Sequence, residues 1–159
     1  VNGWDGSTFQ PSERCDQHVV DYSQFGSDLA SGALPRYVFI TPNLDDDMHD
    51  GSIAQGDQWL ATEVPKILAS DAYQNGGALF IFWDEGSGSL DPGDEPPFFV
   101  VSPNAKAGYR STVDYDSGSY LATIETIFGV QILPCASPTD TDDHKPMADL
   151  FEVPLAGSS

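Results

Sequence analysis

One loop of this sequence holds the side chains that a divalent cation prefers. Residues 41–51 read TPNLDDDMHDG and include Asn43, Asp47, His49 and Asp50. Carboxylate, amide and imidazole groups together supply the oxygen and nitrogen ligands that divalent metal ions take in proteins. This acidic loop (residues 41–51) therefore predicts a metal site, with a solvated acidic loop as the alternative. The loop alone does not decide between the two.

A second acidic site follows the most apolar run in the chain. Residues 78–83 read ALFIFW, and Asp84 and Glu85 come directly after them. Carboxylates at the edge of a core are costly unless they are paired or bind a cation. The pair therefore favours the metal interpretation. A structural alternative stays open, in which Asp84 caps a helix or pairs with Arg36 or Arg110.

Both acidic sites follow segments with the character of buried strands. Residues 37–40 and 78–83 are continuous apolar runs, and 98–101 form a third. Aromatic and β-branched residues without polar alternation are typical of strands buried on both faces, as in parallel sheets. We expect an α/β fold with a mostly parallel central sheet flanked by helices.

The helices are predicted from apolar spacing and from signals at their ends. Pro65 predicts a kink or a restart inside the second of them, near Thr62 and Glu63. The three predicted helices are a short one through Phe25 and Leu29, capped by Asp21 or Ser23 and closed by Gly32; one within 53–70; and one over 120–128, capped by Ser119 and closed by Gly129.

The predicted sheet would bring the two acidic sites together. In an open parallel sheet, ligands bind past the carboxyl ends of the strands, which all lie at one edge. We therefore expect Asp47 and His49 to lie near Asp84 and Glu85, although the two pairs are far apart in the sequence.

Charge limits the kinds of partner that this chain attracts. Its 159 residues suit one domain, and 6 Lys and Arg against 25 Asp and Glu give a net charge of −19. So acidic a chain is not expected to bind nucleic acid or an anionic membrane. A phosphate-bearing substrate would need a strong positive charge in the site, and a metal ion supplies one.

The N-terminus and the two cysteines give information about the cellular compartment of the protein. The chain begins at Val1 and has no apolar run long enough for a signal peptide or a transmembrane helix, so we expect a processed N-terminus. Cys15 and Cys135 either form a disulfide or are two buried thiols, and an upstream cysteine is another candidate partner of Cys15. Composition favours a disulfide in a secreted protein or one of the periplasm or cell envelope.

Several segments, in this order and spacing, give the chain a resemblance to a known family. It resembles the C-terminal half of the bacterial phosphoesterase family, which includes phospholipase C-type enzymes and acid phosphatases, within the alkaline phosphatase-like superfamily. The similarity covers residues 25–151, between an irregular segment at 1–24 and a tail at 152–159. The segments that carry it are LPRYVFITPNLDDDMHDGS, GDQWLATEVPKILAS, GGALFIFWDEG, FFVVSPNAKAGY, YDSGSYLATIETIFG and MADLF.

The resemblance implies metal-dependent hydrolysis of a phosphate ester. Asp47 and His49 match the family's metal-proximal Asp-x-His, and Asp84 and Glu85 match its Asp-Glu pair after the central strand. The implied ion is zinc, manganese, iron or calcium. Nearby polar side chains implied to support substrate binding are Asn43 and Asp50.

The chain departs from the family pattern in two places. The family's Tyr-Asp-His-x-Ser pattern reads Tyr115-Asp116-Ser117-Gly118-Ser119 here, with Ser117 in place of the histidine. The family's N-terminal strands, which carry the nucleophile, are absent, so the catalytic nucleophile is expected outside this chain. The missing N-terminal part of the same precursor is then the expected partner. The alternative is a catalytically inactive, secreted acidic binding or structural module that keeps the fold.

The other basic side chains give weaker signals. His144 follows the run TDTDD, and such charged tails favour a solvated histidine over a metal ligand. Lys106 and Arg110, in the loop after the third strand, are candidates for contact with an anionic substrate or for the solvent-exposed surface.

Overall fold

The computed structural model describes residues 12–86, 95–133 and 144–155. The chain divides into two compact units, unit 1 from Val1 to Asn75 and unit 2 from Gly76 to Ser159. In the described ranges, the structure combines helices with a small two-stranded sheet, which agrees with a mixed α/β protein. No helix in these ranges is long and apolar enough to cross a membrane.

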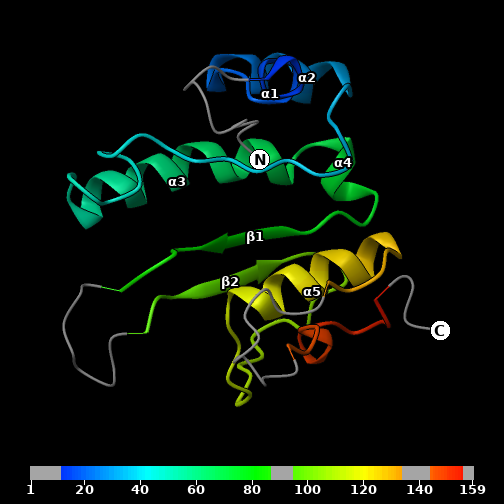
Figure 1. Ribbon diagram of the computed structural model, residues 1–159. Coiled ribbons are helices and arrows are strands. Elements are labelled where there is room, and N and C mark those ends of the chain that lie inside the picture. Colours follow the sequence, from blue (N-terminus) through cyan, green and yellow to red (C-terminus); the bar gives the residue numbers. More distant parts are fainter. Residues whose placement is uncertain (1–11, 87–94, 134–143, 156–159) are drawn as a thin grey trace. The chain divides into compact units, whose positions relative to one another are not determined.

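Unit 1 is helical in its described part (Figure 1). The 3-10 helix η1 is capped by the Asp21 carboxylate, and α2 ends at Gly32, whose φ of 68° confirms the predicted stop. The sequence did not predict α1, which Ser12 caps. The elements of unit 1 are α1 (Glu13–His18), η1 (Tyr22–Gln24), α2 (Phe25–Ser31), α3 (Ile53–Leu68) and α4 (Asp71–Gln74).

Helix α3 begins with a complete capping box. The Ser52 hydroxyl accepts a bond from the Gln55 N–H, and the Gln55 side chain accepts one from the Ser52 N–H. Each side chain therefore satisfies a backbone donor of the other. The helix continues through Pro65 without the predicted restart. Proline costs about 3 kcal/mol inside a helix. The apolar stripe predicted for this helix is half-buried and consists of Leu60, Val64, Ile67 and Leu68.

Tyr22 joins η1 to the middle of α3. Its hydroxyl donates a hydrogen bond to Glu63 at 2.7 Å, and its ring lies 5.7 Å from that of Trp59. Burial and the bond to Glu63 raise the pKa of Tyr22 well above its usual range. The bonds from Lys66 and Tyr22 in turn lower the pKa of Glu63.

The predicted strand at residues 37–40 is wrong. In the structure this run belongs to no strand, and Phe39 is 61% exposed. A strand forms only where a neighbouring strand satisfies its backbone groups. In the described ranges, the two strands that form pair only with each other.

Unit 2 contains those two strands, and they are antiparallel. β1 (Leu79–Phe82) and β2 (Phe98–Val101) confirm the predicted strand positions, with Leu79 opposite Val101 and Phe82 opposite Phe98. The predicted parallel direction is therefore wrong for this pair. A parallel pair needs a long crossover, usually a helix, and the Gly-, Pro- and Asp-rich sequence between β1 and β2 does not favour one.

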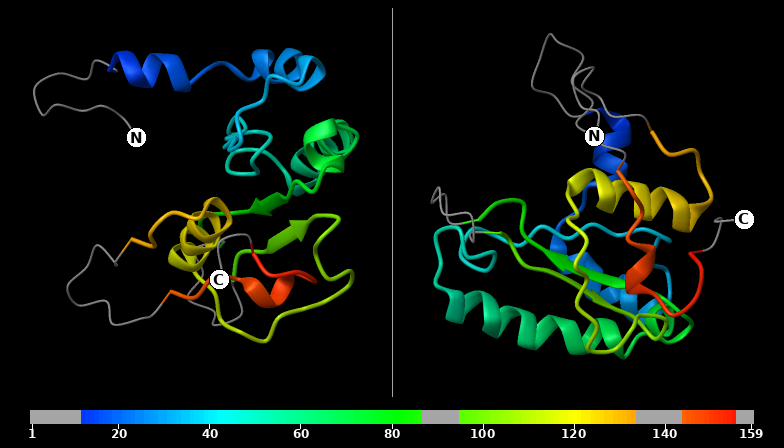
Figure 2. Two further views of the ribbon diagram at one scale, coloured as in Figure 1. Left: turned by 90° about the vertical axis from the view of Figure 1, so that its right-hand side faces the viewer. Right: turned by 90° about the horizontal axis from the view of Figure 1, so that it is seen from below.

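Helix α5 (Ser117–Phe128) covers one face of the two strands (Figures 1 and 2). The ring of Tyr120 lies 4.7 Å from Phe82 and 5.5 Å from Phe80. The helix ends at Gly129, as predicted, with φ of 64°. Its cap is Asp116 and not the predicted Ser119, because the Asp116 carboxylate accepts the Ser119 N–H. An Asp and a Ser three residues apart are both good caps, so the sequence alone left the choice open.

The C-terminal segment is attached to α5 through one buried hydroxyl. Thr123 is fully buried, donates to the Ser119 carbonyl at 2.7 Å and accepts the Met147 N–H at 2.8 Å. Met147 is 2% exposed and precedes the 3-10 helix η2 (Ala148–Leu150). Thr123 therefore provides the hydrogen-bond acceptor for the buried backbone N–H of Met147.

The Asp149 carboxylate is hydrogen-bonded to the loop between β2 and α5. It accepts hydrogen bonds from the hydroxyls of Tyr115, Ser111 and Tyr109 at 2.6, 2.7 and 3.1 Å. Burial works against the charge, but these hydroxyls outweigh it and hold the pKa of Asp149 below its usual value. Burial and the bond to Asp149 raise the pKa of Tyr115. The carboxylate thus holds three points of one loop.

The cysteine prediction falls partly outside the described residues. Cys15 is half-buried in α1, and Cys135 is not among the residues that the structure describes. Their pairing stays a prediction.

Replacing Thr123 by valine tests the buried link. Thr123→Val keeps the side-chain shape but leaves the Met147 N–H without its acceptor, so we expect a loss of about 1 to 3 kcal/mol in the free energy of unfolding. The matched control is Thr126→Val, because the Thr126 hydroxyl donates to the Ala122 carbonyl of its own helix and, among the described residues, links α5 to no other segment. We expect that change to stay within about 0.5 kcal/mol. Urea unfolding measures both, and equal losses would contradict the assignment.

Asp149 predicts a pH dependence of stability. Its folded pKa lies below the unfolded value of 3.8, so its contribution is present above that value and is lost as the pH falls through the folded pKa. We expect the difference in unfolding free energy between wild type and Asp149→Asn to be largest near neutral pH and to shrink below about pH 4. Unfolding at a series of pH values measures it. The control Asp114→Asn changes a carboxylate at an exposed position and should leave the stability close to that of the wild type. A difference for Asp149→Asn that does not change with pH would refute the linkage.

Candidate functional site

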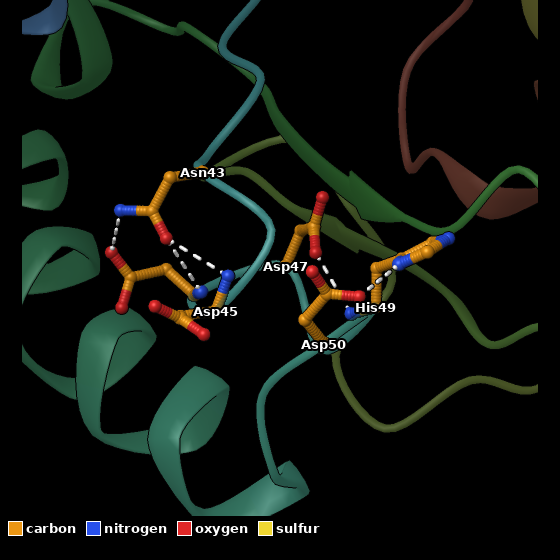
Figure 3. A network of polar contacts seen from close by, with 6 residues as sticks. Asn43, Asp45, Asp47, His49 and Asp50 are labelled. Atoms are coloured by element: carbon orange, nitrogen blue, oxygen red, sulfur yellow. Dashed lines mark hydrogen bonds and ion pairs between the residues drawn. The ribbon is translucent and has the colours of Figure 1, made fainter.

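Asn43 holds the first half of the acidic loop (Figure 3). Its side-chain oxygen accepts the N–H groups of Asp45 and Asp46, both at 3.0 Å. Its side-chain nitrogen donates to the Asp46 carboxylate at 2.7 Å. The loop therefore turns around Asn43, as Asn side chains favour in turns.

Asp47, His49 and Asp50 lie side by side in the second half of the loop (Figure 3). The Asp47 carboxylate accepts the His49 N–H at 2.8 Å, and His49 Nδ1 lies 2.8 Å from an Asp50 oxygen. The side chains of His49 and Asp50 are 67% and 60% exposed. The structure thus brings Asp47 and His49 together, and Asp50 orients the imidazole.

Close backbone contacts fix this shape. The Leu44 carbonyl accepts the N–H groups of Asp50 and Gly51 at 2.8 and 3.2 Å. Met48 has a φ of 76°, a left-handed conformation that is uncommon outside glycine and that often occurs at functional sites. The Met48 side chain lies against Gly56 of α3, where a Cβ atom would also come within 2.9 Å of the Asp46 carbonyl. The loop is therefore built onto the start of α3.

Asp84 and Glu85 lie directly beyond β1, as the sequence predicted, but in an exposed bend. The chain leaves the strand at Phe82, and Trp83 is the last partly buried residue before the pair. The expected cost of burying these carboxylates therefore does not arise. Exposed carboxylates at a strand end are open to a cation without a desolvation penalty.

His144 is not the solvated residue that its acidic neighbourhood predicted. Its side chain is 17% exposed, and Nδ1 lies 2.9 Å from one oxygen of Asp116 and 3.0 Å from the other. The imidazole ring lies against Gly118, where a Cβ atom would come within 2.6 Å of it. The sequence missed this pair because its members are 28 residues apart.

Asp116 both contacts the His144 imidazole and caps the N-terminus of α5. Burial opposes its charge, but the bonds from Ser119 and then the interaction with His144 outweigh burial and lower the pKa of Asp116. The carboxylate therefore keeps its charge while it holds the imidazole. The neighbouring Ser117, where the family pattern has a histidine, is the first residue of α5.

The donor types fit a divalent cation. Oxygen and imidazole ligands are present, and a carboxylate that orients an imidazole through one ring nitrogen is the usual partner of a metal-binding histidine. In residues 12–86, 95–133 and 144–155, no three His, Cys, Asp or Glu are already gathered in a metal-binding group. Asp47 and His49 belong to unit 1, and Asp84 and Glu85 belong to unit 2. Their predicted grouping stays a prediction.

Comparison with known proteins places these residues in a family. The chain belongs to the Phosphoesterase family, whose model matches residues 6–131. The match includes both acidic sites and Asp116, and it ends before His144. The resemblance seen in the sequence is thereby confirmed. No solved structure matches the chain.

Several characterised proteins are similar to this chain. A phosphatidylinositol-3-phosphatase of Mycobacterium tuberculosis is 36% identical over 112 residues, which are 70% of this chain and 36% of that protein. An acid phosphatase of Aspergillus niger is 27% identical over 74% of this chain and 28% of its own length. One of Aspergillus fumigatus is 30% identical over 74% of this chain and 27% of its own length. The chain therefore spans about a third of these relatives' length or less.

A substitution at Gly51 tests whether the acidic loop depends on a close backbone contact. A Cβ atom there would lie 2.7 Å from the carbonyl carbon of Asp45 and 2.8 Å from its Cα. We expect Gly51→Ala to force the backbone apart and to cost about 1 to 3 kcal/mol of stability. Gly26→Ala is the control, since none of the described residues packs within 4 Å of its Cβ position in α2 and alanine favours a helix. Thermal unfolding compares them, and equal stabilities would contradict the close contact.

Proposed function

We propose that the intact protein hydrolyses phosphate esters with the help of a divalent metal ion. The observation that carries the proposal is the family match over residues 6–131, which contains every predicted ligand. The names of the similar proteins, a phosphatidylinositol-3-phosphatase and acid phosphatases, support the same reaction class. An alkaline phosphatase-like fold of the intact protein is part of the proposal.

The residues proposed to hold the ion are Asp47, His49, Asp84 and Glu85. When bound, the ion would supply positive charge that polarises the phosphoryl oxygens of the substrate. That charge matters here because a chain with a net charge of −19 otherwise repels a phosphate ester. Zinc, manganese, iron and calcium remain the candidate ions.

The other loop residues position these ligands. Asn43 fixes the turn before Asp47 by its three side-chain bonds, and Asp50 orients His49 through Nδ1. Holding a polar group in place before the substrate binds reduces the entropy lost on reaction. Contact of Asn43 and Asp50 with the substrate remains part of the proposal.

The nucleophile is proposed to come from outside this chain. The expected source is the N-terminal part of the same precursor, which would complete the site. Export to the cell envelope or the medium is proposed with it.

The proposal is tested by measuring the phosphoesterase activity of the intact protein, with and without metal, and by comparing it with the Asp84→Asn variant. We expect hydrolysis of p-nitrophenyl phosphate or of a phosphate diester, loss of that activity on chelation, and recovery on adding back a divalent metal. Asp84→Asn should lower kcat/KM by about 100-fold or more. The loss of a residue that only supports a metal ligand typically costs 10- to 100-fold, and the loss of a ligand itself should cost more. The control Asp57→Asn changes an exposed carboxylate of α3 and should keep the activity.

Two results would count against the proposal. Full activity in the presence of a strong chelator would exclude the metal role. A folded, intact protein without activity on any phosphate ester would favour the alternative, an inactive binding or structural module.

A further inference from the structure

An open pocket in unit 1 is lined by the acidic loop and by α3. Its volume of about 540 Å³ falls within the range of roughly 300 to 1,000 Å³ that is typical of small-molecule sites. The proposed metal ligands are not among its lining residues. We call it the Trp59 pocket, and apart from one alanine its described lining residues are Asp46, Gln55, Gln58, Trp59, Thr62 and Glu63.

One face of α3 forms most of the Trp59 pocket. Gln55, Gln58, Trp59 and Thr62 stand at positions i, i+3, i+4 and i+7 of the helix, so they lie on one side of it. Three of the four are polar and exposed, and the half-buried apolar stripe that starts at Leu60 is a separate set. This face of α3 is therefore not a core-packing face, although it carries a large aromatic ring.

The Trp59 indole is held in place from outside the pocket. The ring of Tyr22 lies 5.7 Å from it, and the Tyr22 hydroxyl bonds Glu63, one helical turn further along α3. Tyr22 itself does not line the pocket. An aromatic side chain that is positioned before a ligand arrives loses little conformational entropy on binding.

The polar groups around the indole offer both donors and acceptors. The side-chain oxygen of Gln55 is used by the N–H and the hydroxyl of Ser52, and its side-chain nitrogen bonds to none of the described residues. One oxygen of Asp46 is bonded within the loop, whereas the other accepts no hydrogen bond in the described part of the chain. The same holds for the side-chain oxygen of Gln58, whose nitrogen is the group that bonds.

This mixture of groups favours one class of ligand. An anion needs positive charge, and no Lys, Arg or His is among the described lining residues. A cation needs unpaired negative charge, but both oxygens of Glu63 are already bonded, one to Lys66 and one to Tyr22. A hydroxyl group both donates and accepts, and the apolar C–H face of a sugar ring packs on an aromatic ring. Several hydroxyls on such a ring match the pocket.

We propose that the Trp59 pocket binds an uncharged sugar ring, stacked on the indole, with its hydroxyls bonded to Asp46, Gln55 and Gln58. This inference goes beyond the proposed function and does not rest on it. The sugar has two sources of the same chemistry, a free saccharide and the alcohol part of a phosphate ester. The second source is included because Asp46 directly precedes the proposed metal ligand Asp47.

The test titrates the intact protein with the methyl glycosides of glucose, galactose, mannose and N-acetylglucosamine. Calorimetry measures the affinity, and ¹H–¹⁵N NMR follows the indole N–H signals, of which the Trp59 signal is assigned by its loss in Trp59→Leu. We expect at least one glycoside to bind and to shift the Trp59 signal until it saturates. Trp59→Leu should weaken that binding by about 10-fold or more, because the stacking surface is lost.

Three further variants separate a binding surface from a general effect on the helix. Gln58→Met keeps the side-chain length but removes its polar groups, and it should weaken binding by about 2- to 10-fold. Trp59→Phe keeps an aromatic ring and should bind more tightly than Trp59→Leu. The matched control is Gln17→Met in α1, an exposed glutamine outside the pocket, and it should bind as the wild type does. Unfolding temperatures show that each variant is folded.

A kinetic comparison distinguishes the two sources of the sugar. It measures kcat/KM for the 6-phosphate of the sugar that binds, relative to kcat/KM for ethyl phosphate. If the sugar part of a substrate occupies the pocket, Trp59→Leu should lower this ratio by about 10-fold. If the ratio stays constant while glycoside binding is lost, the ligand is a free saccharide. Both results support a sugar site.

Three results would overturn the inference: no glycoside binds the wild type, a glycoside binds without shifting the Trp59 signal, or folded Trp59→Leu binds with unchanged affinity. Should Trp59→Leu fail to fold, unchanged affinity of Gln58→Met would overturn it. Failure of the proposed function is a separate result. A protein that binds a glycoside at Trp59 and hydrolyses no phosphate ester supports the sugar site and contradicts the phosphoesterase activity.

Discussion

The hydroxyl of Thr123 is the interaction on which the C-terminal part of unit 2 depends. It has no access to solvent, it bonds to the helix on one side, and it accepts the Met147 N–H on the other. A buried amide without an acceptor is costly, so the segment after Met147 has one favourable position against α5. From that anchor follow the bridge between Phe151 and Ala105, the place of Asp149 among three hydroxyls, and the place of His144 at the start of the helix.

A second constraint is the excess of negative charge. The chain has about four acidic residues for each basic one, so most carboxylates cannot be stabilised by ion pairs. The structure uses neutral donors in their place. Hydroxyls hold Asp149, and backbone N–H groups hold Asp47 and Asp116. Bonds of this kind fix an oxygen in position without cancelling its charge, which leaves the carboxylates able to attract a cation.

The two units contribute different parts of the proposed machinery. Unit 1 supplies a tightly turned loop with an exposed imidazole, built onto the capped start of α3. Unit 2 supplies carboxylates at a strand end. Membership of the Phosphoesterase family gives both a common context, since residues 6–131 fall within its model. The C-terminal segment lies beyond that model, and its His144 contacts Asp116, which the family alone would not have indicated.

The sequence by itself determined the features that depend on near neighbours. Gly32 and Gly129 end their helices, Asp47 and His49 share one loop, and the apolar runs at β1 and β2 form strands. Each of these follows from side chains and backbone groups a few residues apart. Family membership was also readable, because the order and spacing of several segments carry it.

Only the tertiary structure decided the direction of the strands, the absence of a strand at residues 37–40, and the place of His144. A strand forms, and takes its direction, only against a partner, and an apolar run has the same composition whether or not a partner is present. The acidic surroundings of His144 in the sequence predict a solvated side chain, yet a carboxylate 28 residues away and a glycine beside it hold the ring in place. Contacts between residues so distant along the chain arise only when the chain folds, so no local pattern encodes them.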